Sequence, residues 1–127
     1  MSTTMAPSLN VFGEKLIPCN EAPMTGYFRD GCCNTSEQDA GSHTICASVT
    51  AEFLTFSKSE GNDLSTPRPE FGFVGLRPGD SWCLCAARWL TAYKNDAAPH
   101  IHLMRTHQLA LEIVPMETMK AFAADLN

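Results

Sequence analysis

The stretch from residue 77 to residue 89 constrains the fold most strongly, because a turn, a strand and a helix start follow one another there. Pro78 and Gly79 are the pair that a type II turn requires, since proline presets φ at the second position and glycine accepts the positive φ at the third. The next residues read Ser-Trp-Cys-Leu-Cys, and side chains alternate between the two faces of a strand. We therefore predict a strand over 81–85 with Cys83 and Cys85 on one face, followed directly by a helix.

The other elements follow from capping residues, prolines and apolar spacing. Thr50 is a good N-cap and Gly61 a good residue after a C-terminus, which predicts a helix over 51–60. The same reasoning predicts further helices over 86–94, 106–112 and 116–124, a strand over 71–76 paired with 81–85, and a strand over 100–104. We expect an α+β fold in which three or four helices pack on one side of a small, mostly antiparallel sheet, with a long irregular loop over about 18–44.

Length and composition limit the classes of protein. A chain of 127 residues is expected to form one domain, here 9–127 behind a loose leader at 1–8. The net charge is -5, with no basic cluster, which argues against nucleic-acid binding. Nor does any apolar segment approach the ~20 residues of a membrane helix.

The N-terminus has no basic region followed by an apolar run, so export is not expected and a cytoplasmic location is predicted. In a reducing compartment the six cysteines are expected to be free thiols, metal ligands or small buried groups rather than a disulfide framework.

Three motifs in order resemble one bacterial family, the domain of unknown function 2237: Gly-Tyr-Phe-Arg-Asp-Gly-Cys-Cys-Asn at 26–34, Gly-Asn-Asp-Leu-Ser-Thr-Pro-Arg-Pro-Glu at 61–70, and Gly-Leu-Arg-Pro-Gly-Asp-Ser-Trp-Cys-Leu-Cys-Ala at 75–86. The resemblance covers nearly the whole chain. It implies a compact single domain and no established activity. Gln108 stands where the family pattern suggests glutamate.

The first chemical hypothesis is a zinc-binding site. His43 and Cys46 are spaced as His-x-x-Cys, and Cys83 and Cys85 as Cys-x-Cys, so the four side chains offer the mixed imidazole and thiolate shell that zinc accepts. The alternative is that these cysteines are small apolar core residues, which is a common role of free cysteine.

Thiol chemistry is the second hypothesis. Cys85 directly precedes the predicted helix, and the adjacent Cys32 and Cys33 lie in a polar loop near Arg29, so a helix dipole or a cation could favour a thiolate. The sequence assigns no base to any of these thiols. Structural cysteine is again the alternative.

The third hypothesis is a non-enzymatic binding module, which uses its polar loops to bind a small or anionic ligand or another protein without covalent chemistry. Arginine forks recognise carboxylate and phosphate groups, and polar side chains of both signs lie in or beside the irregular segments. The candidates are Arg29, Asp30, Asn62, Asp63, Arg68 and Arg88. The alternative is that they form internal ion pairs and satisfy loop backbone groups.

Overall fold

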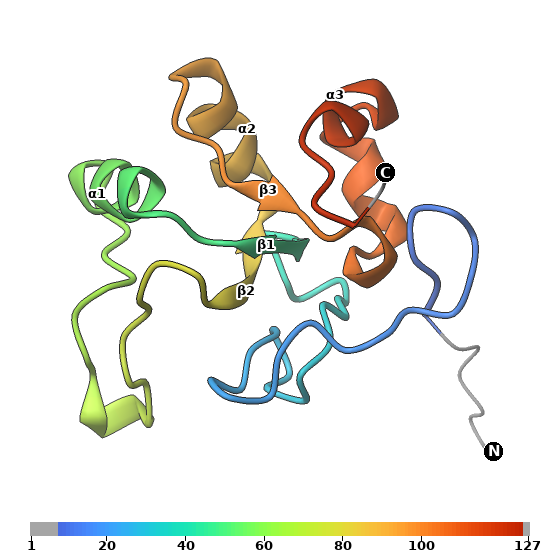
Figure 1. Cartoon of the computed structure of the whole chain (residues 1–127). Coiled ribbons are helices and arrows are strands. Elements are labelled where there is room, and N and C mark those ends of the chain that lie inside the picture. Colours follow the sequence, from blue (N-terminus) through green and yellow to red (C-terminus); the bar gives the residue numbers. More distant parts are fainter. Residues whose placement is uncertain (1–7, 126–127) are drawn as a thin grey trace, which may run out of the picture.

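A three-stranded antiparallel sheet lies at the centre of the molecule (Figure 1). The computed structural model describes residues 8–125, so the predicted leader lies, except for Ser8, outside the described residues. The strands are β1 (His43–Ser48), β2 (Ser81–Cys85) and β3 (His100–Ile101), in the order β2-β1-β3. The predicted α+β class with a small antiparallel sheet is confirmed, and β2 is an edge strand.

Helices supply most of the remaining regular structure. The α-helices are α1 (Ala51–Ser59), α2 (Ala86–Lys94) and α3 (Met116–Ala121), and the short 3-10 helices are η1 (Pro69–Phe71), η2 (Leu103–Arg105) and η3 (Gln108–Glu112). The predicted N-cap of α1 is confirmed, because the Thr50 hydroxyl accepts a hydrogen bond from the Phe53 N–H at 3.0 Å. No helix in the described part of the chain combines the length and the apolar character of a membrane span.

The strand predicted over 71–76 is wrong. The turn before β2 does form, since the Asp80 N–H donates to the Arg77 carbonyl at 3.0 Å and Gly79 has φ +99°. However, the Gly79 N–H donates to the Val49 carbonyl, and the Val49 N–H donates to the Asp80 carbonyl. The turn is therefore attached to the end of β1, which pairs with β2 in place of the segment 71–76.

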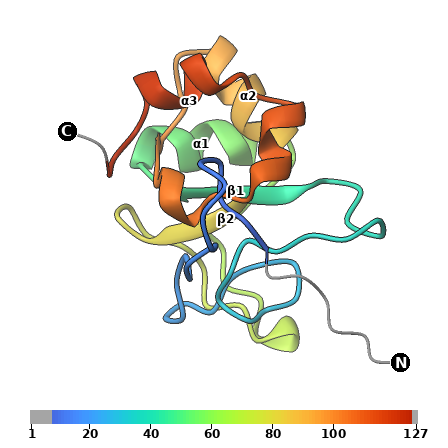
Figure 2. The ribbon, with the colours of Figure 1, turned by 90° about the vertical axis from the view of Figure 1, so that its right-hand side faces the viewer.

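The two faces of the sheet are covered differently. One face carries the apolar residues Ile45, Ala47, Trp82 and Leu84, which belong to the main core together with residues of the helices. The other face is covered by the N-terminal coil, which lies opposite the helices in Figure 2. A separate buried cluster lies there, formed by Cys19, Cys33, Cys46 and Cys83.

Candidate functional site

A pocket of about 570 Å³ lies beside edge strand β2 and the start of α2. Its walls come from β2, the loop that precedes β1 and the long connection between α1 and β2. Many of the residues proposed from the sequence line it, namely Arg29, His43, Asn62, Asp63, Arg68, Cys83, Cys85 and Arg88. The pocket thus brings together segments that are far apart in the sequence.

Cys85 occupies the junction between strand and helix. It is a free, half-buried thiol, and it is the N-cap residue of α2 with no side-chain cap bond. The first N–H of the helix, that of Ala86, donates to the Ser42 carbonyl at 3.0 Å. The following N–H groups and the helix dipole create a positive potential at the helix start.

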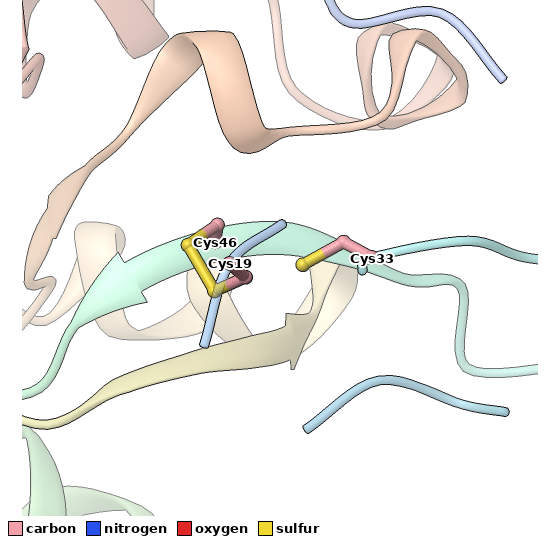
Figure 3. A group of neighbouring side chains, drawn as sticks. All are labelled: Cys19, Cys33 and Cys46. Carbon is pink, nitrogen blue, oxygen red and sulfur yellow. A yellow bond between two sulfur atoms is a disulfide. The ribbon is translucent and has the colours of Figure 1, made fainter. Parts of the chain in front are cut away.

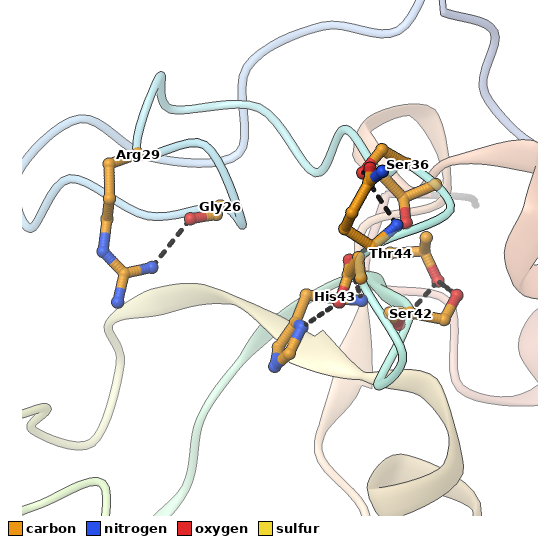
Figure 4. A network of polar contacts seen from close by, with 9 residues as sticks. Gly26, Arg29, Ser36, Ser42, His43 and Thr44 are labelled. Atoms are coloured by element: carbon orange, nitrogen blue, oxygen red, sulfur yellow. Dashed lines mark hydrogen bonds and ion pairs between the residues drawn. The ribbon is translucent and has the colours of Figure 1, made fainter.

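His43 is oriented by the buried carboxylate of Asp39, and Figure 4 shows His43 with the dashed lines to its polar contacts. The Asp39 side chain is 1% exposed, and its Oδ1 lies 2.7 Å from His43 Nδ1. Oδ2 accepts hydrogen bonds from the His43 N–H and the Thr35 hydroxyl, both at 2.9 Å. With Nδ1 donating to the carboxylate, the neutral ring has its lone pair on Nε2, where it can accept a proton.

The hydrogen bonds also determine the charge of Asp39. Burial opposes ionisation, but the bonds from the His43 side chain and backbone and from Thr35 outweigh it, so the pKa of Asp39 lies below its usual value. The carboxylate is therefore ionised at neutral pH and able to hold the imidazole.

His43 and Cys85 lie opposite each other across the β1–β2 pair, beside a bulge in β1. Gly41 borders both side chains: a Cβ built on it would lie 3.0 Å from His43 Cε1 and 3.5 Å from Cys85 Sγ. A free thiol and an imidazole thus lie at the pocket, and a buried carboxylate outside it binds the imidazole. Nucleophilic enzyme sites combine these three kinds of group.

The arginines of the pocket have different partners. The Arg29 guanidinium donates to the Gly26 carbonyl at 2.7 Å and lies 5.1 Å from the centre of the Trp82 ring, so it is part of the wall. In the described part of the chain no carboxylate lies within ion-pair distance of Arg68 or Arg88. Both can therefore attract an anionic ligand.

Asp63 organises its own loop. Its carboxylate accepts hydrogen bonds from the backbone N–H and the hydroxyl of both Ser65 and Thr66. The Thr66 and Ser65 bonds hold the pKa of Asp63 far below its usual range. Asp63 is therefore a permanent charge in a turn and not a proton donor.

The predicted zinc set is not formed. Cys46 is disulfide-bonded to Cys19, and Cys83 is disulfide-bonded to Cys33. Two of the four proposed ligands are thus engaged on the buried face of the sheet, while His43 and Cys85 lie at the pocket. The prediction failed because it assumed reduced cysteines. That assumption followed from the predicted cytoplasmic location, which stays a prediction.

Of the three candidate thiols, Cys85 is the one that forms no disulfide and lines the pocket. Cys33 is in a disulfide. Burial raises the pKa of the Cys32 thiol, and the carboxylates of Asp30 and Glu21 raise it further. The predicted effect of Arg29 on Cys32 is not realised, because the Arg29 side chain extends over Trp82.

Asp30 and Cys32 also lie outside the residues that line the pocket. The Asp30 carboxylate accepts bonds from the Cys32 N–H at 3.0 Å and from the Asn34 amide at 3.1 Å. It therefore organises the 30–34 loop, as the alternative interpretation of the polar residues expected.

Sequence reasoning missed Asp39 and Cys19. Asp39 lies four residues before His43 in a loop. A spacing of four residues predicts a side-chain contact in a helix but not in a loop. Cys19 is bonded to a strand 27 residues away, and spacing alone cannot identify such a partner.

We predict that Asp39→Asn lowers the free energy of unfolding at pH 7 by about 1–3 kcal/mol, because a buried charge-assisted hydrogen-bond set is lost. The folded-state pKa of Asp39 lies below the unfolded-state value, so this stabilisation is present above about pH 4 and is lost as the pH falls through the folded-state pKa. Urea unfolding at pH 7 and pH 3 measures the difference between wild type and variant, which should shrink at pH 3.

Glu37→Gln is the matched control, since Glu37 is an exposed carboxylate of the same loop. It should change the free energy of unfolding by less than about 0.5 kcal/mol. An Asp39→Asn variant as stable as wild type at pH 7 would contradict the role assigned to Asp39.

Comparison with known proteins gives one family match. The model of a family described as an uncharacterized protein conserved in bacteria (DUF2237) matches residues 9–123. No curated protein matches the chain.

Proposed function

The chain belongs to the DUF2237 family, whose description assigns no activity, and we propose that it is a thiol-dependent enzyme with Cys85 as the nucleophile. His43 is the base that accepts the thiol proton, and Asp39 is the positioning residue that holds the imidazole. The observation that carries the proposal is the placement of a free thiol at a helix start, in register with a histidine whose other nitrogen is bound to a buried carboxylate.

The chemistry suited to this arrangement is acyl transfer. The Cys85 proton moves to His43 Nε2, the sulfur forms a bond to a carbonyl carbon, and the carbonyl π pair moves to its oxygen. N–H groups of the first turn of α2 are available to stabilise that oxygen or the thiolate. Collapse of the intermediate breaks the bond to the leaving group, which takes the proton from His43, and water then hydrolyses the thioester.

The pocket suggests the kind of substrate. Arg68 and Arg88 offer guanidinium groups without a carboxylate partner in the described residues, and Tyr27, Phe73 and Trp82 supply aromatic walls. A small molecule that combines an apolar or aromatic part with a carboxylate or phosphate matches both features.

A second function is supported by the same arginines. A binding module for a small anionic ligand would use Arg68 and Arg88 without any covalent step. The two functions differ in their demand on Cys85: Cys85→Ala abolishes the enzyme but leaves a binding module able to retain its ligand.

Alkylation of the native, non-reduced protein tests the reactivity of Cys85. At pH 7, iodoacetamide should label Cys85 at least about ten times faster than Cys32, because Cys85 lies opposite His43 across the β1–β2 pair, whereas burial, Asp30 and Glu21 raise the pKa of the Cys32 thiol. Peptide mass spectrometry at successive times gives both rates in one sample.

The same protein unfolded in urea, with its disulfides intact, is the control, and there the two rates should converge. Native rates that are equal, or a slower rate at Cys85, would contradict an activated nucleophile.

A further inference from the structure

Four buried cysteines, Cys19, Cys33, Cys46 and Cys83, form a cluster on one face of the sheet, and Figure 3 shows the first three of them. The sulfurs of Cys19, Cys33 and Cys46 all lie within 4.8 Å of one another. Cys83 is not one of these three mutually close sulfurs, but its own sulfur is bonded to that of Cys33. We propose that the protein binds one zinc ion through these four cysteines when its two disulfides are reduced.

The spacing of the sulfurs suits a tetrahedral thiolate site. With Zn–S bonds of about 2.3 Å, the sulfurs of such a site lie about 3.8 Å apart. To reach that separation, the Cys19 and Cys46 sulfurs, which are bonded to each other, have to move apart by about 1.7 Å, and the distances from them to the Cys33 sulfur have to shorten by no more than about 1 Å. Reduction lengthens the two bonded pairs, and side-chain rotation is enough for movements of this size.

The backbone already holds the four positions in place. Cys46 and Cys83 face each other in register on β1 and β2. The N–H groups of Cys19 and Asn20 donate to the Gly31 carbonyl at 2.7 and 3.1 Å, which fastens the Cys19 segment to the loop that carries Cys33. These bonds do not depend on the disulfides, so the ligands stay close after reduction.

The surroundings match a closed, structural zinc site. All four cysteines are at most 3% exposed, as in a closed structural zinc site. Zinc with four thiolates carries a net charge of −2. The Arg105 guanidinium lies 3.5 Å from the Cys19 carbonyl oxygen and supplies a nearby positive charge.

The conversion between the disulfide form and the zinc-bound form is balanced in electrons and protons. Two equivalents of a dithiol reductant deliver four electrons and four protons, which break both disulfides and give four thiols while two disulfides form on the reductant. Binding of Zn²⁺ then releases the four protons. In the reverse direction, two equivalents of hydrogen peroxide take four electrons from the thiolates and four protons from solvent and become water, both disulfides form and the zinc ion is released.

The two forms hold the same loops by different cross-links. In the oxidised form the disulfides tie residues 19 and 33 to the sheet, and in the reduced form the zinc ion does so. The fold around the pocket is thereby kept in both oxidising and reducing surroundings. This inference does not depend on the function proposed for Cys85.

Metal binding by the full chain tests the inference. Protein reduced with a phosphine under nitrogen, mixed with excess Zn²⁺ and desalted should carry one zinc ion per chain by elemental analysis, and non-reduced protein should carry less than a tenth of that. Co²⁺ in place of Zn²⁺ should give the intense visible absorption of tetrahedral thiolate coordination.

Matched variants locate the ligands. Cys32→Ser and Cys85→Ser remove the two cysteines outside the cluster and should leave both the zinc content and the cobalt spectrum unchanged, whereas Cys19→Ser and Cys46→Ser should weaken zinc binding at least tenfold. Reduced wild type that is folded by circular dichroism yet free of zinc would overturn the proposal. So would reduced protein that is unfolded and does not refold with Zn²⁺, or loss of the cobalt spectrum in Cys85→Ser.

Discussion

Replacing Trp89 by alanine is expected to lower the free energy of unfolding by about 3–5 kcal/mol, a large part of the stability of a domain of this size. The side chain is fully buried in α2, and its indole N–H donates to the Pro99 carbonyl at 3.0 Å. Its ring stacks on that of Tyr93 with 5.7 Å between the ring centroids, and it forms a T-shaped pair with the ring of Phe122 at a centroid distance of 5.5 Å. The substitution leaves a cavity and an unpaired carbonyl between α2 and the C-terminal segment.

Urea unfolding followed by circular dichroism measures the loss. Leu109→Ala is the control, because Leu109 is a large apolar side chain that is already 39% exposed, and it should cost less than half as much. A loss below about 1 kcal/mol in Trp89→Ala would show that Trp89 does not hold the helices to the core.

Removing the Cys33–Cys83 disulfide with Cys33→Ala and Cys83→Ala together is expected to lower the stability of the metal-free protein by about 2–5 kcal/mol. The bond closes a loop of sequence separation 50, whereas the Cys19–Cys46 bond closes one of 27. Removing the Cys19–Cys46 disulfide with Cys19→Ala and Cys46→Ala together should cost about 0.5 kcal/mol less, because the entropy of closing a loop increases with loop length.

Unfolding in urea without reductant compares the two double variants with wild type. Cys32→Ala is the control, since it removes a half-buried cysteine that forms no disulfide, and it should change stability little. Double variants as stable as wild type would contradict a structural role for the disulfides.

Local signals in the sequence were sufficient for the elements next to the pocket. Neighbouring residues alone indicate the turn at Pro78-Gly79, the alternating side chains of β2 and the start of α2 directly after it. Thr50 caps α1 as predicted. These features depend on backbone preferences over a few residues, which a single sequence reveals.

Long-range partners could not be found in this way. The segment 71–76 has a strand-like pattern, yet its place beside β2 is taken by β1, with which the turn shares two hydrogen bonds. The cysteine pairing and the contact between Asp39 and His43 likewise depend on the path of the 18–42 loop, which has no periodic pattern. The polar residues of the pocket were therefore named from the sequence, but their convergence was not.

The rate at which iodoacetamide alkylates Cys85 in His43→Gln tests the central claim most directly. Glutamine fills similar space but cannot accept the thiol proton, so the rate at pH 7 should fall at least about tenfold. His100→Gln is the control, because His100 is exposed on β3, and it should react at the wild-type rate. A wild-type rate in a folded His43→Gln variant would contradict the assignment of His43 as the base of a Cys85 nucleophile.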